Sequence, residues 1–174
     1  LEGVGDWKRY ATQLLPIGLG LAVSTVLNGL VPSKLKAQLV FWRIRNPLPG
    51  SRAFSELAFD DPRIDEELLR KKLGALPAEE KTQNARWYEL YQMVKDDPAV
   101  SGGHKDFLFT RDYASLSLLI AVPLISLACL MVSEPGLLII YIALLSLQYL
   151  LVRLAAEHYG RRLVTNVLAL VSSR

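Results

Sequence analysis

Three long stretches of the chain carry almost no charge, and they determine its expected organisation. Residues 11–31 and 114–132 are uncharged, and a third apolar run covers residues 137–152 and ends at Arg153. A helix rises about 1.5 Å per residue, so about 20 apolar residues span a hydrocarbon core roughly 30 Å thick. Because the runs have no polar face, we expect membrane-spanning helices rather than the buried hairpin of a soluble domain.

The pattern predicts an all-α integral membrane protein with three transmembrane helices and a small cytoplasmic helical segment between the first and the second. The predicted spans are residues 11–31, 113–133 and 137–156. The third span extends beyond Arg153 because a long arginine side chain can reach the headgroups. Residues 134–136 form an external turn, since proline followed by glycine is a strong turn signal.

The first apolar run also admits a second interpretation, as a signal peptide, because Lys8 and Arg9 precede it. Its length exceeds the roughly 7–15 apolar residues of a usual signal core. The residues after it do not form the small-x-small pattern of a cleavage site. We therefore expect a retained helix.

Basic residues flank the predicted spans unevenly. Residues 32–112 begin with a basic cluster and arginines follow the third span, whereas the external turn carries only Glu134. The positive-inside rule then places residues 32–112 and 157–174 in the cytoplasm and residues 1–10 on the outer side. The expected location is a bacterial inner membrane, with the N-terminus outside and the C-terminus in the cytoplasm.

Composition narrows the possible chemistry. The net charge of +3 and the pI near 9.0 suit a basic membrane protein as well as a nucleic-acid-binding one, so they give no direct indication of nucleic acid as a partner. Cys129 is the only cysteine, which excludes a disulfide framework and a cysteine-based metal site. His104 and His158 are the only histidines, which excludes a histidine-rich metal site.

Residues 33–54 have the composition of a segment that lies on a membrane surface. Apolar residues, Trp42 among them, are mixed with basic ones. Tryptophan and basic side chains together favour the interface of an anionic bilayer. We expect contacts with anionic lipid from four basic residues: Lys34, Lys36, Arg43 and Arg45.

Two short amphipathic helices are expected next. Asp61 is predicted to cap the first helix, Pro62 to occupy its first position and Gly74 to end it. Pro77 is predicted to open the second helix, which ends before Pro98. Neither helix buries much apolar area by itself, so both must pack on each other, on the membrane or on another chain.

The second of these helices carries a predicted partner surface formed by Trp87, Tyr88 and Tyr91. Residues 101–103, Ser-Gly-Gly, are predicted to form a hinge that leads into the second span. Residues 157–174 are predicted to form a cytoplasmic amphipathic helix that docks, because it is too short to be stable alone.

Small and polar residues recur at spacings of four in the first span. The predicted helix-packing or pore stripe consists of Thr12, Gly20, Ser24 and Asn28, together with Gln148 of the third span. Such stripes let helices approach closely in lipid. Two interpretations remain open, packing within the chain and oligomerisation with pore lining. Gln148 is placed to reach either Tyr141, seven residues earlier on the same helix face, or a neighbouring helix.

Arg153 and His158 have the Arg-x4-His spacing and in this resemble the HEPN family of ribonucleases, over six residues of the chain. The resemblance implies an RNA-cleaving site built from these two side chains. The other interpretation is an ion pair between Arg153 and Glu157, four residues apart on one helix, with His158 at the membrane interface. We favour the ion pair.

The sequence contains no Gly-rich phosphate loop, no Gly-x-Ser-x-Gly and no His-Glu-x-x-His. No catalytic, cofactor-binding or metal-binding residue is therefore predicted, and no cofactor. The leading hypothesis is a small oligomeric membrane protein, a channel-like or membrane-perturbing effector whose cytoplasmic helices sense a signal or partner. The alternatives are a non-catalytic anchor or scaffold subunit of a larger complex, and a membrane-bound enzyme using Arg153 and His158.

Overall fold

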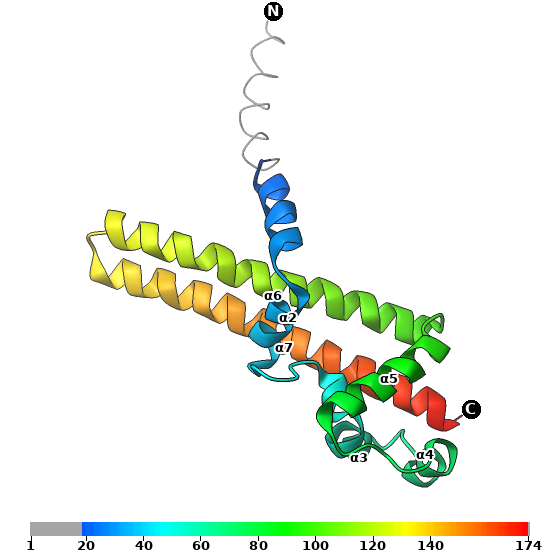
Figure 1. Ribbon diagram of the computed structural model, residues 1–174. Coiled ribbons are helices and arrows are strands. Elements are labelled where there is room, and N and C mark those ends of the chain that lie inside the picture. Colours follow the sequence, from blue (N-terminus) through cyan, green and yellow to red (C-terminus); the bar gives the residue numbers. More distant parts are fainter. Residues whose placement is uncertain (1–18, 174) are drawn as a thin grey trace, which may run out of the picture. The chain divides into compact units, whose positions relative to one another are not determined.

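The computed structural model describes residues 19–173, which form helices joined by turns and loops and contain no strand (Figure 1). The all-helical prediction is confirmed for this part of the chain. The chain divides into two compact units, Leu1–Pro32 and Ser33–Arg174.

The first unit contains one described helix, Leu19–Leu30, whose apolar side chains are largely exposed. Thr12 and the other residues of the predicted first span before Leu19 lie outside the described residues. The described helix is shorter than the roughly 20 residues that a span requires. Three spans therefore stay a prediction. The helix ends shortly before Pro32, which has no N–H and cannot donate a helical hydrogen bond.

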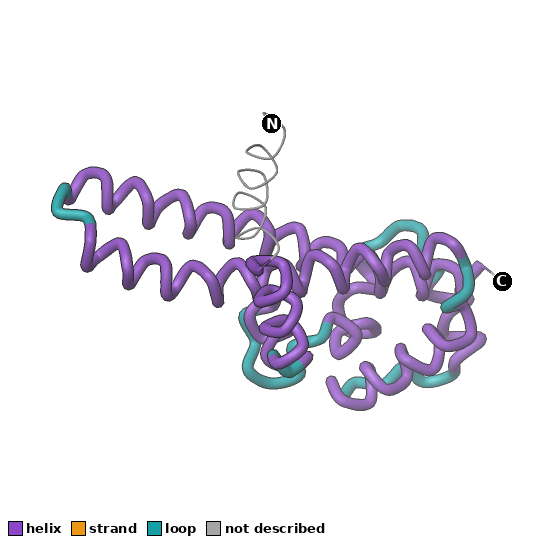
Figure 2. Tube along the Cα trace, turned by 90° about the horizontal axis from the view of Figure 1, so that it is seen from above, coloured by secondary structure: helices purple, strands orange, loops and turns teal. Residues whose placement is uncertain are grey.

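The second unit is built on a hairpin of two long helices, α6 (Pro98–Met131) and α7 (Pro135–Ser173), which run side by side in opposite directions (Figures 1 and 2). Both are long and apolar enough to cross a membrane. Each begins with a proline, which suits the first helical position because its missing N–H would have no partner there. The Asp97 carboxylate caps α6 by accepting from the Ala99 N–H at 3.0 Å.

The predicted hinge at residues 101–103 is wrong, because these residues lie inside the unbroken helix α6. The cap at Asp97 starts the helix before the two glycines are reached. A glycine inside a helix costs only about 1 kcal/mol relative to alanine, so it need not interrupt one. At Gly103 a β-carbon would lie 3.8 Å from Asn166 Nδ2, so this part of α6 packs closely against α7.

The head of the second unit consists of short helices that pack along one side of the hairpin, in the half away from its turn (Figures 1 and 2). These are α2 (Ser33–Phe41), the 3₁₀ turn η1 (Pro49–Arg52), the π turn η2 (Ala53–Leu57), α3 (Ala58–Asp60), α4 (Glu66–Leu73) and α5 (Glu80–Val94). Their apolar faces meet those of α6 and α7 in one core. Its fully buried members include Ala37, Val40, Leu69, Leu90, Val100, Val164, Val167 and Leu168.

Gly160 allows α2, α6 and α7 to meet. A β-carbon at this position would lie 2.7 Å from Phe41 Cζ and 3.0 Å from Phe107 Cε2, which is too close. The Phe41 and Phe107 rings lie 6.0 Å apart, centroid to centroid, directly over the glycine. The missing side chain therefore creates the space that two aromatic rings fill.

The two amphipathic helices exist, but they begin later than predicted. Helix α4 begins at Glu66 and is capped by Asp65, which accepts from the Leu68 N–H at 2.9 Å. Asp61 does not cap it, because its carboxylate accepts from Arg63 Nε at 2.9 Å instead. Helix α5 begins at Glu80 and not at Pro77. The predicted stop at Gly74 is confirmed by its φ of 74°, which favours glycine.

The predicted C-terminal helix is the continuation of α7 and not a separate element. It docks as expected, because Val164, Val167 and Leu168 are fully buried in the head core. Lys72 of α4 donates from Nζ to the carbonyl oxygens of Val171 at 3.1 Å and Ser172 at 3.0 Å. These bonds satisfy carbonyl groups at the end of a helix, which have no partner within it.

Candidate functional site at the base of the hairpin

The half of the hairpin that projects beyond the head exposes an apolar surface (Figure 1). Its exposed large side chains include Val122, Leu127, Leu130, Met131, Leu137, Ile139, Ile140, Leu144, Leu147 and Leu151. A continuous apolar surface of this kind marks contact with a membrane or another protein.

Aromatic and polar side chains occur together where the head ends and this apolar surface begins. Gln148 Nε2 donates to the Tyr113 hydroxyl at 3.0 Å, which joins α7 to α6, so of the two predicted partners Gln148 reaches the neighbouring helix and not Tyr141. The adjacent residue of α7, Tyr149, donates from its hydroxyl to the Leu39 carbonyl of α2 at 2.9 Å and accepts from Trp42 Nε1 at 3.2 Å. These bonds join α2, α6 and α7 at one level.

Trp42 and Arg153 form a second contact at this level. The Arg153 guanidinium lies 4.0 Å from the centroid of the Trp42 ring, a cation–π geometry. Trp42 reaches this place from a left-handed backbone conformation, φ 50°, which directly follows α2 and is unusual for a bulky residue. Arg153 Nη2 also lies 2.8 Å from Glu157 Oε2, which confirms the predicted ion pair, whereas the His158 side chain is exposed.

Two of the four predicted lipid-contacting residues take part in internal ion pairs. Lys36 is only 5% exposed, and its Nζ lies 3.2 Å from Asp112 Oδ2. Arg111 donates to the other oxygen of the same carboxylate, from Nε at 2.9 Å and from Nη2 at 2.7 Å. A single carboxylate thus faces two cations, and the buried Lys36 ammonium is directed at protein rather than at lipid.

Arg43 is the second internally paired residue. Its Nη2 donates to Glu80 Oε1 at 2.6 Å, and Asn46 Nδ2 donates to Glu80 Oε2 at 2.9 Å. The hydrogen bonds from Asn46 and then from Arg43 lower the pKa of Glu80 below its usual value. These contacts connect the loop after α2 to the start of α5.

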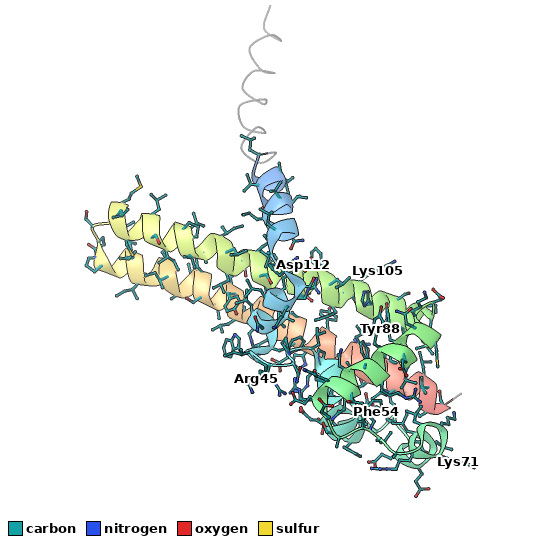
Figure 3. All side chains as sticks on the ribbon, viewed as in Figure 1. Arg45, Phe54, Lys71, Tyr88, Lys105 and Asp112 are labelled. Carbon is teal, nitrogen blue, oxygen red and sulfur yellow. The ribbon has the colours of Figure 1, made fainter. Side chains whose placement is uncertain are left out.

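A basic cavity of about 850 Å³ opens beside these pairs. It is lined by Ser33, Lys34, Ala37, Ile44, Arg45, Asn46, Pro47, Leu48, Ser51, Lys81, Asn84 and Arg111. Lys34 and Arg45 were expected from the sequence at a lipid surface, and Arg45 projects from the loop below α2 (Figure 3). Lys81 and Arg111 were not expected, because only the packing of α5 and α6 on α2 brings them to this place.

The predicted partner surface on α5 is divided between the core and the outside. Trp87 lies under η1, since a β-carbon on Gly50 would meet its ring at 2.9 Å. Tyr91 stacks on Trp87 at 5.7 Å and approaches His104 of α6 at 5.3 Å, centroid to centroid. Tyr88 stacks on Tyr91 at 5.8 Å but is 54% exposed, so it is the outward member of the set (Figure 3).

Burial also shifts two pKa values in this aromatic group. Desolvation, followed by the Arg111 charge, lowers the pKa of His104 below 6.5, so the imidazole favours its neutral form. Desolvation raises the pKa of the Tyr91 hydroxyl, which therefore stays protonated at neutral pH.

Three described members of the predicted stripe, Gly20, Ser24 and Asn28, lie on the Leu19–Leu30 helix. Ser24 Oγ donates to the Gly20 carbonyl at 2.7 Å, and a β-carbon at Gly20 would meet nothing within 4 Å. Asn28 is partly buried on the same helix, and Gln148 belongs to the other unit.

Within residues 19–173, no three histidine, cysteine or carboxylate side chains come together to hold a metal ion. No known protein family matches the chain, and neither a curated protein nor a solved structure matches it.

Proposed function

We propose that the chain is a non-catalytic membrane anchor, a subunit that holds its helical head against the cytoplasmic face of a bilayer within a larger assembly. In this proposal α6 and α7 cross the membrane with the turn at residues 132–134 on the outer side. The residues of the predicted span 11–31 supply a third crossing, so the N-terminus lies outside. A bacterial inner membrane is the proposed location.

The observation that carries this proposal is the continuity of α6 and α7. Each helix runs without interruption from the buried core of the head into the exposed apolar half of the hairpin. In water that apolar half would have no cover, whereas in a bilayer its side chains face hydrocarbon and its backbone groups are satisfied within the helices. The head packs on the same two helices, so it is then held at a defined distance from the membrane surface.

The boundary residues support the same placement. Trp42, Tyr113 and Tyr149 lie at one level, as aromatic residues do where a membrane meets water. Charged pairs, such as Lys36 with Asp112, lie just on the head side of this level.

A channel-like effector is the second candidate, and the open surface around Gly20 favours it. A β-carbon there would meet nothing within 4 Å, which leaves room for a second helix at close distance. In the described hairpin the Gln148 amide nitrogen already donates to Tyr113 within the chain, so Gln148 does not by itself indicate a second copy.

The test uses the full-length protein expressed in cells and then purified alone in detergent. For the anchor we expect the chain to stay in the membrane pellet after alkaline carbonate extraction. We also expect a monomer by native mass spectrometry and no ion flux in liposomes. Release into the carbonate supernatant would contradict membrane integration. A defined homo-oligomer that conducts ions would contradict the anchor and support the effector.

A further inference from the structure

Resting on the proposed membrane integration, we propose that the basic cavity between α2, α5 and α6 binds the phosphate group of an anionic lipid headgroup. The cavity is formed by residues that lie far apart in the sequence, from α2, the loop after it, α5 and α6. Its ligand is a phosphodiester with a glycerol backbone and acyl chains, held at the cytoplasmic surface.

The charge of the cavity favours an anion. Four cationic side chains line it, Lys34, Arg45, Lys81 and Arg111, and the lining contains no acidic side chain. None of the ion pairs formed by residues 19–173 involves Lys34, Arg45 or Lys81. Their positive charges are therefore available to a ligand.

The nearby ion pairs offset this positive charge only in part. Asp112 is shared between Lys36 and Arg111, so it cannot fully offset both cations. Glu80 accepts from Arg43 and Asn46, on the loop that leads into the cavity wall. Both acids are thus paired with other donors, and a phosphate group is a suitable counter-charge for Lys34, Arg45 and Lys81.

The position of the cavity, at the edge of the exposed apolar surface, favours a lipid over a soluble phosphate compound as the ligand. Arg111 lies two residues before Tyr113, which marks the start of the apolar surface, and Trp42 adjoins Arg45 through a short loop. In the proposed membrane placement, the cavity therefore lies at the level of the lipid headgroups and their phosphates. Basic residues beside aromatic ones at such a level are a common setting for anionic lipids.

The apolar part of the lining also suits a lipid. Ala37, Ile44, Pro47 and Leu48 complete the wall, and the Ile44 side chain is 82% exposed. A soluble anion would leave this apolar surface exposed to water, whereas the glycerol backbone and the first methylenes of a lipid would cover it. Basic and apolar groups therefore face the two chemically different parts of one molecule.

The experiment measures phosphatidylglycerol binding to the full-length protein in neutral detergent, by native mass spectrometry, with phosphatidylcholine as the reference lipid. The test variant is Lys34→Gln/Arg45→Gln/Lys81→Gln, which removes three exposed cations and breaks no ion pair of the described residues. The matched control is Lys71→Gln/Lys95→Gln/Lys105→Gln, which removes the same charge from exposed positions outside the cavity lining. Lys71 lies on α4 and Lys105 on α6 (Figure 3).

We expect wild type and control to prefer phosphatidylglycerol, and the test variant to lose that preference. Each basic residue near an anionic lipid contributes about fivefold in affinity, so the test variant should bind on the order of a hundredfold more weakly. Equal losses in test and control variants would overturn the proposal, because the effect would then be one of net charge alone.

A parallel arm with inorganic phosphate distinguishes the source of the phosphate group. If millimolar phosphate raises the melting temperature of wild type but not of the test variant, and lipid preference is absent, the cavity takes a soluble anion and the lipid proposal is overturned. Failure of lipid preference in a protein that resists carbonate extraction rejects this inference alone. Release by carbonate rejects the proposed function itself.

Discussion

Gly160 and Gly102 show how much the surroundings of a residue decide what it does. Both are helix-interior glycines, and both offer the same gain in helical propensity on replacement by alanine. At Gly160 a β-carbon would meet two phenylalanine rings, and at Gly102 it would meet nothing within 4 Å. The sequence alone does not distinguish them, because the rings at Gly160 arrive from helices that are distant in the chain.

We predict that Gly160→Ala destabilises the protein by about 1–3 kcal/mol, because Phe41 and Phe107 must move to admit the methyl group. Gly102→Ala is the matched control and should be neutral or stabilise by up to about 1 kcal/mol. Thermal unfolding of both variants in the same detergent provides the comparison. Equal losses of stability would show that α6 needs flexibility at Gly102, as a hinge would.

His104 gives stability a pH dependence whose direction follows from its burial. Its pKa is lowered in the folded state from an unfolded value of 6.5. The unfolded chain therefore binds more protons than the folded one once the pH falls below about 6.5, and the free energy of unfolding decreases. Above that pH His104 is neutral in both the folded and the unfolded state, so it no longer decreases the free energy of unfolding.

We expect His104→Gln to flatten this dependence below about pH 6.5, because the group whose pKa is lowered by burial is then absent. Melting temperatures measured across that range for wild type and variant provide the test. An unchanged slope in the variant would mean that another group titrates there.

At the scale of elements, the apolar runs predicted α6 and α7 well because a long uncharged run has few alternatives to a helix. Predicted helix ends were less accurate. Asp61 and Pro62 have the composition of a helix start, yet Arg63 binds the Asp61 carboxylate and α4 begins later. The sequence also predicts Lys34 and Arg45 at a membrane surface, but it does not reveal that Lys36 reaches Asp112 on α6. Which lysine meets an acid depends on how helices pack, and a pattern along one helix does not contain that information.

The ion pair between Lys36 and Asp112 connects α2 to α6, and we predict that it matters for stability. Asp112→Asn leaves the buried Lys36 ammonium and the Arg111 guanidinium without their shared carboxylate. The expected loss is on the order of 2–3 kcal/mol, since a buried cation without its counter-charge is costly. Asp106→Asn, at an exposed acid on the same helix, is the control and should change stability little.

These unfolding measurements are best made on the purified full-length chain by chemical denaturation in mild detergent. A loss for Asp112→Asn no larger than that for Asp106→Asn would show that Lys36 finds another partner or water. It would also weaken the claim that α2 is fixed to the hairpin at this level.

At the scale of the molecule, the second unit combines a charged head and an apolar hairpin on the same two helices. The exposed apolar half of α6 and α7 begins at the level of Tyr113 and Tyr149, and the ion pairs lie on the head side of that level. This division of charge is the physical basis for placing one half of the unit in a bilayer. In the proposed placement, the cavity at this boundary would bring its cations to the level of the lipid phosphates.

The orientation of the hairpin across the membrane is the most direct consequence of this placement. It can be measured by labelling single cysteines with a membrane-impermeant maleimide, in a Cys129→Ser background that removes the only natural thiol. Ser133→Cys reports on the turn, and Tyr88→Cys reports on the exposed surface of the head. We predict that Ser133→Cys reacts in intact cells and that Tyr88→Cys reacts only after the membrane is permeabilised. Labelling of both positions from the same side would contradict a membrane-crossing hairpin.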